Sequence, residues 1–215
     1  MRLISNKTRL YQKEAVALNQ DQSNLQWPIK SEVKDCSLQQ INFTRTHLNH
    51  PIFTNVVFEN CLFDRTILDD ARFYGCDFMN CTFRKVKFEA STIGAHGGAY
   101  RNCIFEQCRF GRASFYNPEF IDCLFEQCCW NGADLNASFF ENCRFTGKLD
   151  DVRFRGRYES DLYPNARPNP MRNVDFSEAQ LGKYVDFTDC DLSSAIPPTG
   201  RTFAEIRQAA IKGEE

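Results

Sequence analysis

Cysteine is the residue type in this sequence with the clearest capacity for chemistry. The 215 residues include eleven cysteines, which are potential metal ligands or disulfide partners. Neighbouring cysteines follow a C-x4-C spacing, as in Cys76/Cys81 and Cys103/Cys108, whereas zinc sites are typically built from C-x2-C knuckles, and none is present. The odd count argues against complete disulfide pairing, and a chain of this length does not need disulfides to fold. We therefore predict no metal site.

Histidines and carboxylates do not form a recognisable catalytic arrangement. The three histidines are His47, His50 and His96, and neither a Ser/His/Asp arrangement nor a histidine pair at metal-binding spacing stands out. His96 lies in a glycine-rich stretch that lacks the G-K-[ST] motif of a phosphate-binding loop. We therefore expect no catalytic residue, no cofactor and no enzymatic activity.

The overall charge and the distribution of apolar residues argue against nucleic acids and membranes as partners. The chain carries 26 basic and 28 acidic residues, a formal net charge of −2, so it lacks the strongly basic surface of a non-specific nucleic-acid binder. No apolar run approaches the 18 residues of a membrane-spanning helix, and the first residues lack the apolar core of a signal peptide. We expect a cytoplasmic protein without direct nucleic-acid or membrane contacts.

The phenylalanines recur at a regular spacing along the chain. Eighteen of the twenty phenylalanines lie at the centre of a five-residue unit, and ten of the eleven cysteines stand two residues before a centre. There are 26 units: twelve over residues 36–95, nine over 103–147, one centred on Phe154, and four that end at residue 194. We predict that the central residues form the core, with these nine as its structural phenylalanines: Phe58, Phe63, Phe78, Phe83, Phe105, Phe110, Phe115, Phe125 and Phe145.

A period of five fits neither ordinary secondary-structure element. On an α-helix, steps of five advance a side chain by about 140° net, so the phenylalanines would spiral around every face. On a strand, the side-chain period of two would send successive centres to opposite faces. The pattern fits a chain that runs extended for about three residues, points the small residue and the phenylalanine inward, and then turns a corner. Repeated corners wind such a chain into a stacked β-solenoid.

This geometry leaves two outcomes open for the cysteines. Residues twenty apart, such as Cys61 and Cys81, lie one coil apart at ~4.8 Å, which is within reach of a disulfide. We favour the alternative of small, buried, free thiols. Cys129 points outward by its register, and we interpret it as an inert surface thiol rather than a catalytic one.

The unit of a small residue, a polar residue, Phe or Leu, and two polar residues resembles the pentapeptide-repeat proteins over residues 36–194. The resemblance implies an all-β fold, the right-handed quadrilateral β-helix with four units per coil. Two stretches, 96–102 and 157–173, break the repeat, and we interpret them as loops at corners. Residues 1–35 and 195–215 remain as N-terminal and C-terminal caps. The second cap includes a predicted helix, because Thr202 and Glu205 form a capping box ahead of an apolar stripe of Phe203, Ile206 and Ala210.

The resemblance also implies a function. Some members of this family bind DNA gyrase or topoisomerase IV as mimics of B-DNA and protect the enzyme from inhibitors or toxins, and family members often form homodimers through the C-terminal end. Mimicry needs an acidic surface, and the most acidic segment is 174–194 with a charge of −4. Because the net charge is only −2 and the faces look mixed, the alternative is a scaffold that docks another protein without a topoisomerase role.

The candidate partner-binding residues lie in the two breaks and in the acidic C-terminal coil. An irregular loop on a rigid scaffold is a common place for specific contacts, and carboxylates would face a basic partner. The candidates are His96, Tyr100, Arg157, Arg167, Arg172, Asp175, Asp186, Asp189 and Asp191.

Overall fold

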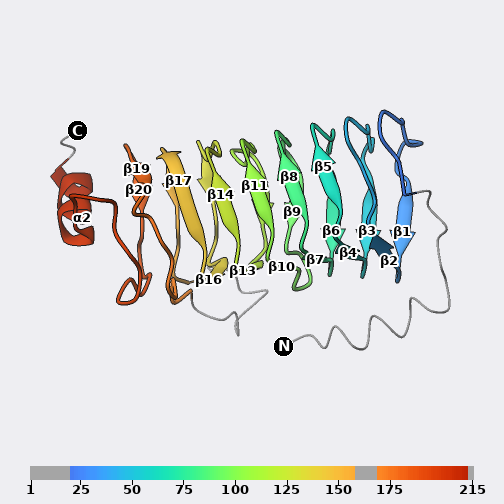
Figure 1. Cartoon of the computed structure of the whole chain (residues 1–215). Helices are drawn as coiled ribbons and strands as arrows, with labels where there is room; N and C mark the ends of the chain where they lie inside the picture. Colours follow the sequence, from blue (N-terminus) through green and yellow to red (C-terminus); the bar gives the residue numbers. More distant parts are fainter. Residues whose placement is uncertain (1–19, 158–168, 213–215) are drawn as a thin grey trace.

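The chain winds into a stack of coils, capped at one end by a helix (Figure 1). The computed structural model describes residues 20–157 and 169–212. Strands from successive coils lie on one another and pair in parallel, as between β1 (Glu32–Lys34) and β3 (Ile52–Thr54). The fold is therefore a β-solenoid, as predicted, with α2 (Phe203–Lys212) at its C-terminal end.

Strand ladders run along the sides of the solenoid. The first ladder continues from β1 and β3 through β6 (Arg72–Tyr74), β9 (Thr92–Ile93) and β12 (Ser114–Phe115). The second contains β2 (Ser37–Gln39), β4 (Val57–Glu59), β7 (Asp77–Met79), β10 (Ala99–Arg101), β13 (Glu119–Ile121) and β16 (Phe139–Glu141). The third contains β5 (Leu62–Asp64), β8 (Thr82–Arg84), β11 (Ile104–Glu106), β14 (Leu124–Glu126), β17 (Arg144–Leu149) and β19 (Ala179–Leu181). A short ladder towards the C-terminus contains β15 (Ala133–Asp134), β18 (Val152–Arg153) and β20 (Val185–Asp186). The remaining side is held by single bridges between Gln26, His47, Ile67, Lys87, Arg109 and Cys129.

The corners explain why the last position of most units is polar. Asn60, Asn80 and Asn102 occupy that position on one corner, with φ angles of 54°, 53° and 50°. Asparagine adopts this left-handed conformation more readily than most residues. Its amide also joins neighbouring coils, since Asn102 Nδ2 donates a hydrogen bond to Asn80 Oδ1 at 2.7 Å.

The core is a set of stacked aromatic columns. Phe63 and Phe83 stack with ring centroids 4.7 Å apart, Phe83 and Phe105 at 4.8 Å, and Phe105 and Phe125 at 4.9 Å. Rings from adjacent sides meet edge to face, as between Phe78 and Phe83 at 5.5 Å. Both arrangements are favourable for aromatic rings. All nine structural phenylalanines are at most 4% exposed: Phe58, Phe63, Phe78, Phe83, Phe105, Phe110, Phe115, Phe125 and Phe145.

The cysteines fill the narrow space beside the columns. Ten are buried, Cys129 is exposed, and all eleven are free thiols, so the disulfide alternative is not realised. The Cys103 thiol donates to the Phe78 carbonyl oxygen at 3.6 Å, and the Cys123 thiol donates to the Tyr100 carbonyl oxygen at 3.4 Å. Burial raises the pKa of Cys103 and Cys128 well above the usual value for a thiol. These groups act as small, hydrogen-bonded core residues.

The solenoid begins before residue 36, the predicted boundary. Val33 in β1 pairs with Phe53, and the Trp27 ring lies 6.1 Å from that of Phe43. Further towards the N-terminus, Asp21 bridges to Asn42. Val and Trp at inward positions replace the Phe or Leu that marks the repeat, so this coil is not visible in the pattern. The predicted cap over residues 1–19 lies outside the described residues.

The break at 96–102 contains a complete unit. Tyr100 is the centre of β10 and is 2% exposed, and its ring stacks on Phe78 at 4.6 Å and on Phe120 at 4.9 Å. The prediction that Tyr100 binds a partner is therefore wrong, because its ring fills the core. The true insertion is a tight turn, in which the N–H groups of Gly97 and Gly98 donate to the Gly94 carbonyl oxygen.

The break at 157–173 also returns to the coil earlier than predicted. Met171 is fully buried, and Arg172 bridges to Glu141 of β16, so this part belongs to the stack. Two sides earlier in the same coil, Leu149 at the end of β17 points inward and is 1% exposed. Neither unit has a phenylalanine at its centre, so the sequence pattern does not reveal either of them as a repeat unit. Residues 158–168 lie outside the described part of the chain.

The predicted C-terminal helix is α2. Its capping box is formed: the Thr202 N–H donates to a Glu205 carboxylate oxygen at 2.7 Å, and the Glu205 N–H donates to Thr202 Oγ1 at 3.2 Å. The Phe203 ring lies 5.6 Å from that of Phe187 and 6.1 Å from that of Phe176. With Ile206, which is 5% exposed, Phe203 covers the open end of the aromatic columns. The Ala210 side chain, the third member of the predicted stripe, lies outside the described part.

Candidate partner-binding surfaces

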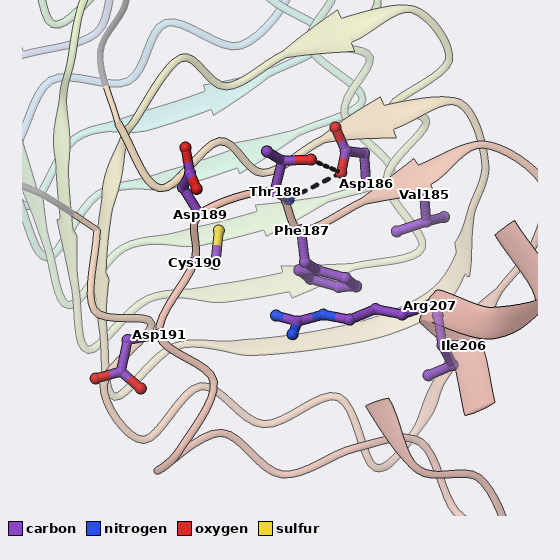
Figure 2. A pocket seen from close by; sticks show the side chains of 9 residues that line it. All are labelled: Val185, Asp186, Phe187, Thr188, Asp189, Cys190, Asp191, Ile206 and Arg207. Carbon is purple, nitrogen blue, oxygen red and sulfur yellow. Dashed lines mark hydrogen bonds between the residues drawn. The ribbon is translucent and has the colours of Figure 1, made fainter. Parts of the chain in front are cut away.

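A groove lies where the last coil meets the C-terminal helix (Figure 2). It has a volume of about 640 Å³, which is within the range of small-ligand and peptide sites. Its lining combines apolar residues from both elements with three of the predicted aspartates. The lining residues are Val185, Asp186, Phe187, Thr188, Asp189, Cys190, Asp191, Ile206 and Arg207.

The groove carboxylates are held by local turns. Asp186 Oδ1 accepts hydrogen bonds from the Thr188 N–H and hydroxyl (Figure 2). Asp191 accepts a hydrogen bond from the Ser193 N–H at 3.0 Å, which lowers the pKa of the Asp191 carboxyl group. The structure thus brings the predicted residues Asp186, Asp189 and Asp191 together in one site.

A second hollow adjoins the groove and contains the predicted Arg157. It has a volume of about 180 Å³ and is lined by Arg153, Arg155, Arg157, Asp186, Thr188 and Asp189. Arg155 forms an ion pair with Asp134 at 2.8 Å. The structure places these arginines directly beside the aspartates of the acidic segment 174–194.

Arg172 and Asp175 lie apart from the groove and are engaged in ion pairs. Arg172 contacts the Glu141 carboxylate at 3.3 Å, and Asp175 lies 3.6 Å from Arg144. Partial burial alone would raise the pKa of Asp175, but hydrogen bonds from Ser177 and the charge of Arg144 lower it overall. The side chains of Arg172 and Asp175 are therefore engaged by residues of the neighbouring coil.

His96 is exposed at the inserted turn, and its ring lies 5.3 Å from that of Tyr74, nearly parallel to it. It therefore stays a candidate contact on a side of the solenoid, well separated in sequence from the groove residues. Arg167 lies in 158–168, outside the described residues.

Charged residues on the sides form ladders of opposite sign. Arg84 pairs with Glu106 at 2.7 Å, and Arg101 pairs with Glu119 at 3.1 Å, in each case across neighbouring coils. The pair Glu89 and Arg109 repeats this arrangement on the bridged side at 3.5 Å. The same spacing that stacks the phenylalanines also brings these charges together, so Glu89, Glu106 and Glu119 are each neutralised by an arginine of a neighbouring coil.

Within 20–157 and 169–212, no group of three or more His, Cys, Asp or Glu side chains is arranged to hold a metal ion. None of the helices in that part is long and apolar enough to span a bilayer.

A family model agrees with the geometry. Residues 34–87 match the model for pentapeptide repeats, and the structure shows the same coil continuing through the rest of the solenoid. The chain thus contains pentapeptide repeats, which the family model identifies over residues 34–87. A comparison with curated protein sequences gave no significant match.

A solved structure shares this fold. The structure of QnrB1, described as a plasmid-mediated fluoroquinolone resistance protein, matches with a TM-score of 0.50 and 10% identity, over 90% of this chain and 84% of QnrB1. HetL, a pentapeptide-repeat protein of the cyanobacterium Nostoc sp. strain PCC 7120 involved in regulating heterocyst differentiation, gives a TM-score of 0.34 and 14% identity, over 83% of this chain and 92% of HetL. At this identity, the similarity to QnrB1 concerns the fold alone.

Proposed function

We propose that this pentapeptide-repeat protein is a non-enzymatic binding protein, a rigid rod that docks another protein. The observation that carries the proposal is the groove at the C-terminal end, where apolar surface and three carboxylates meet beside a helix. The sides, by contrast, carry charges that pair with each other from coil to coil. A rod whose sides carry paired charges and whose C-terminal end carries a groove is suited to docking by that end.

A second candidate is protection of DNA gyrase or topoisomerase IV through mimicry of DNA. Two observations favour it: the fold resembles that of QnrB1, a fluoroquinolone resistance protein, and the segment 174–194 is acidic. Mimicry requires a continuous negative surface that complements the basic DNA-binding surface of the enzyme. The ladder pairs such as Arg84 and Glu106 interrupt such a surface, so we rank this candidate second. A homodimer through the C-terminal end and a cytoplasmic location stay predictions.

A gyrase assay separates the two candidates. Supercoiling and ciprofloxacin-induced DNA cleavage are measured with and without micromolar full-length protein. Protection against ciprofloxacin, or inhibition of supercoiling, would establish topoisomerase binding and displace the scaffold proposal. The scaffold proposal predicts no change in either activity. Its direct test is photo-crosslinking in cells from a probe placed at Asp189, compared with a probe placed at Glu126 on a side. Equal crosslinking from both sites would contradict docking by the end.

A further inference from the structure

Part of the last coil has no backbone partner on its outer edge. In the preceding coil, the Phe154 N–H donates to the Asp186 carbonyl oxygen at 2.7 Å, and the Gly156 N–H donates to the Thr188 carbonyl oxygen at 2.8 Å. The equivalent donors of the last coil are the N–H groups of Phe187 and Asp189. Within the described part of the chain, neither makes a hydrogen bond. An edge of this kind is a template for another strand.

Another side of the same end is already covered by the chain itself. The Phe176 N–H donates to the Ile196 carbonyl oxygen at 2.9 Å, and the Ile196 N–H donates to the Val174 carbonyl oxygen at 2.9 Å. A further rung is therefore laid on Phe176 by the segment that leads to α2. From the described residues, the segment Val185–Asp191 receives no such rung, and it is the segment that lines the groove.

The open edge also ends a ladder of alternating charge. Asp134 is the register partner of Arg153, and Arg153 is the register partner of Asp186. Opposite charges on facing positions of adjacent strands are favourable, and like charges are not. The next position of this ladder therefore suits a basic side chain. Beside it, the side chains of Phe187 and Ile206 line the groove but are only 3% and 5% exposed.

We propose that this groove binds an extended segment of a partner protein as one further parallel rung, with a basic residue on Asp186 followed by a small residue on Phe187, where the Phe203 ring already packs. Strand addition to a free sheet edge is a general mode of peptide recognition, in which main-chain hydrogen bonds supply affinity and alternate side chains supply specificity. In this fold, the residue before a centre donates its N–H to the coil below, as Arg109 does to the Val86 carbonyl oxygen at 2.9 Å. By the same rule, the basic residue donates its N–H to the Val185 carbonyl oxygen and accepts from the Phe187 N–H.

This inference rests on the proposed binding function and adds the chemistry of the partner segment. The two are separable, because the rod can bind a partner through other contacts at this end even if no strand is added.

The probe is a fluorescein-labelled peptide, Ala-Lys-Ala-Ser-Asn, titrated with the full-length protein and followed by fluorescence anisotropy. We expect saturable binding, weakened about fivefold when the lysine is replaced by glutamate, as the loss of one exposed charge pair implies. Methylation of the lysine backbone nitrogen removes its donor and is expected to abolish binding. Amide hydrogen exchange at Phe187 and Asp189 is expected to slow when the peptide binds.

The protein variants are matched in charge. Asp186→Asn keeps the side-chain acceptor for the Thr188 N–H and removes the charge, and it is expected to abolish the preference for lysine over glutamate. Glu126→Gln, which removes one charge from a side of the rod, is expected to leave that preference unchanged. Absence of saturable binding, equal binding of the N-methylated peptide, or the same effect from both variants would overturn the proposal. So would sedimentation equilibrium showing a dimer whose interface protects Phe187 and Asp189, since a second copy would then occupy the groove.

Discussion

The regular middle of the solenoid and its C-terminal end are built from the same unit with different precision. Between Phe58 and Phe145, centres are aromatic with few exceptions, and a single tight turn interrupts the spacing. Beyond Phe145, the inward residues include Leu149, Met171 and Leu181, and the spacing varies. The middle is closed on both edges by its neighbours, whereas the end holds the groove. Where the repeat is regular, every coil is covered by its neighbours, which gives a sealed stack. Where the repeat becomes irregular, at the C-terminal end, a groove remains that can serve as a binding surface.

The largest expected contrast between the two regions comes from removing one ring in each. Phe105→Ala removes a ring that stacks on Phe83 and Phe125 in the sealed stack, and we expect a loss of ~3–5 kcal/mol in the free energy of unfolding. Phe203→Ala removes a partly exposed ring that meets Phe187 and Phe176 edge to face, and we expect roughly half that loss. Urea denaturation followed by circular dichroism measures both. Equal losses would show that the end is packed as tightly as the middle.

A smaller effect tests how the last coil is attached. A Cβ at Gly156 would lie 1.7 Å from the Asp189 carbonyl oxygen, so Gly156→Ala must push the last coil away from the stack. We expect ~3 kcal/mol of destabilisation, with loss of hydrogen-exchange protection concentrated beyond residue 169. Gly97→Ala is the control, because nothing lies within 4 Å of its Cβ and only its φ of 80° opposes the change, at about 1 kcal/mol. A uniform loss of protection along the rod would contradict a locally attached end.

The two regions also differ in how much the sequence predicts. In the middle, a Phe every fifth residue determines the fold, the core and the inward thiols, because one residue type marks every centre. Tyr100 and Met171 are centres without that mark, so the two breaks are interpreted as longer loops than they are. The groove is not predictable from residue spacing, since it depends on where α2 lies over the last coil and on which backbone edge the chain leaves free. The sequence does place Asp186, Asp189 and Asp191 close together, and that clustering is its only indication of the site.

The smallest effect concerns the junction between the regions, where Asp175 of the end lies 3.6 Å from Arg144 of the middle. The pKa of Asp175 is lowered in the folded state, so the charged form stabilises folding above the unfolded-state value of about 3.9. That contribution is lost as the pH falls through the lower folded-state pKa. Asp175→Asn is therefore expected to be less stable than the parent protein at pH 6, by less than about 1 kcal/mol because the pair is partly exposed, and equally stable at pH 2. Thermal unfolding at both pH values measures this difference. A deficit of the same size at pH 2 would assign the role of Asp175 to packing and its turn hydrogen bond with Ser177 rather than to its charge.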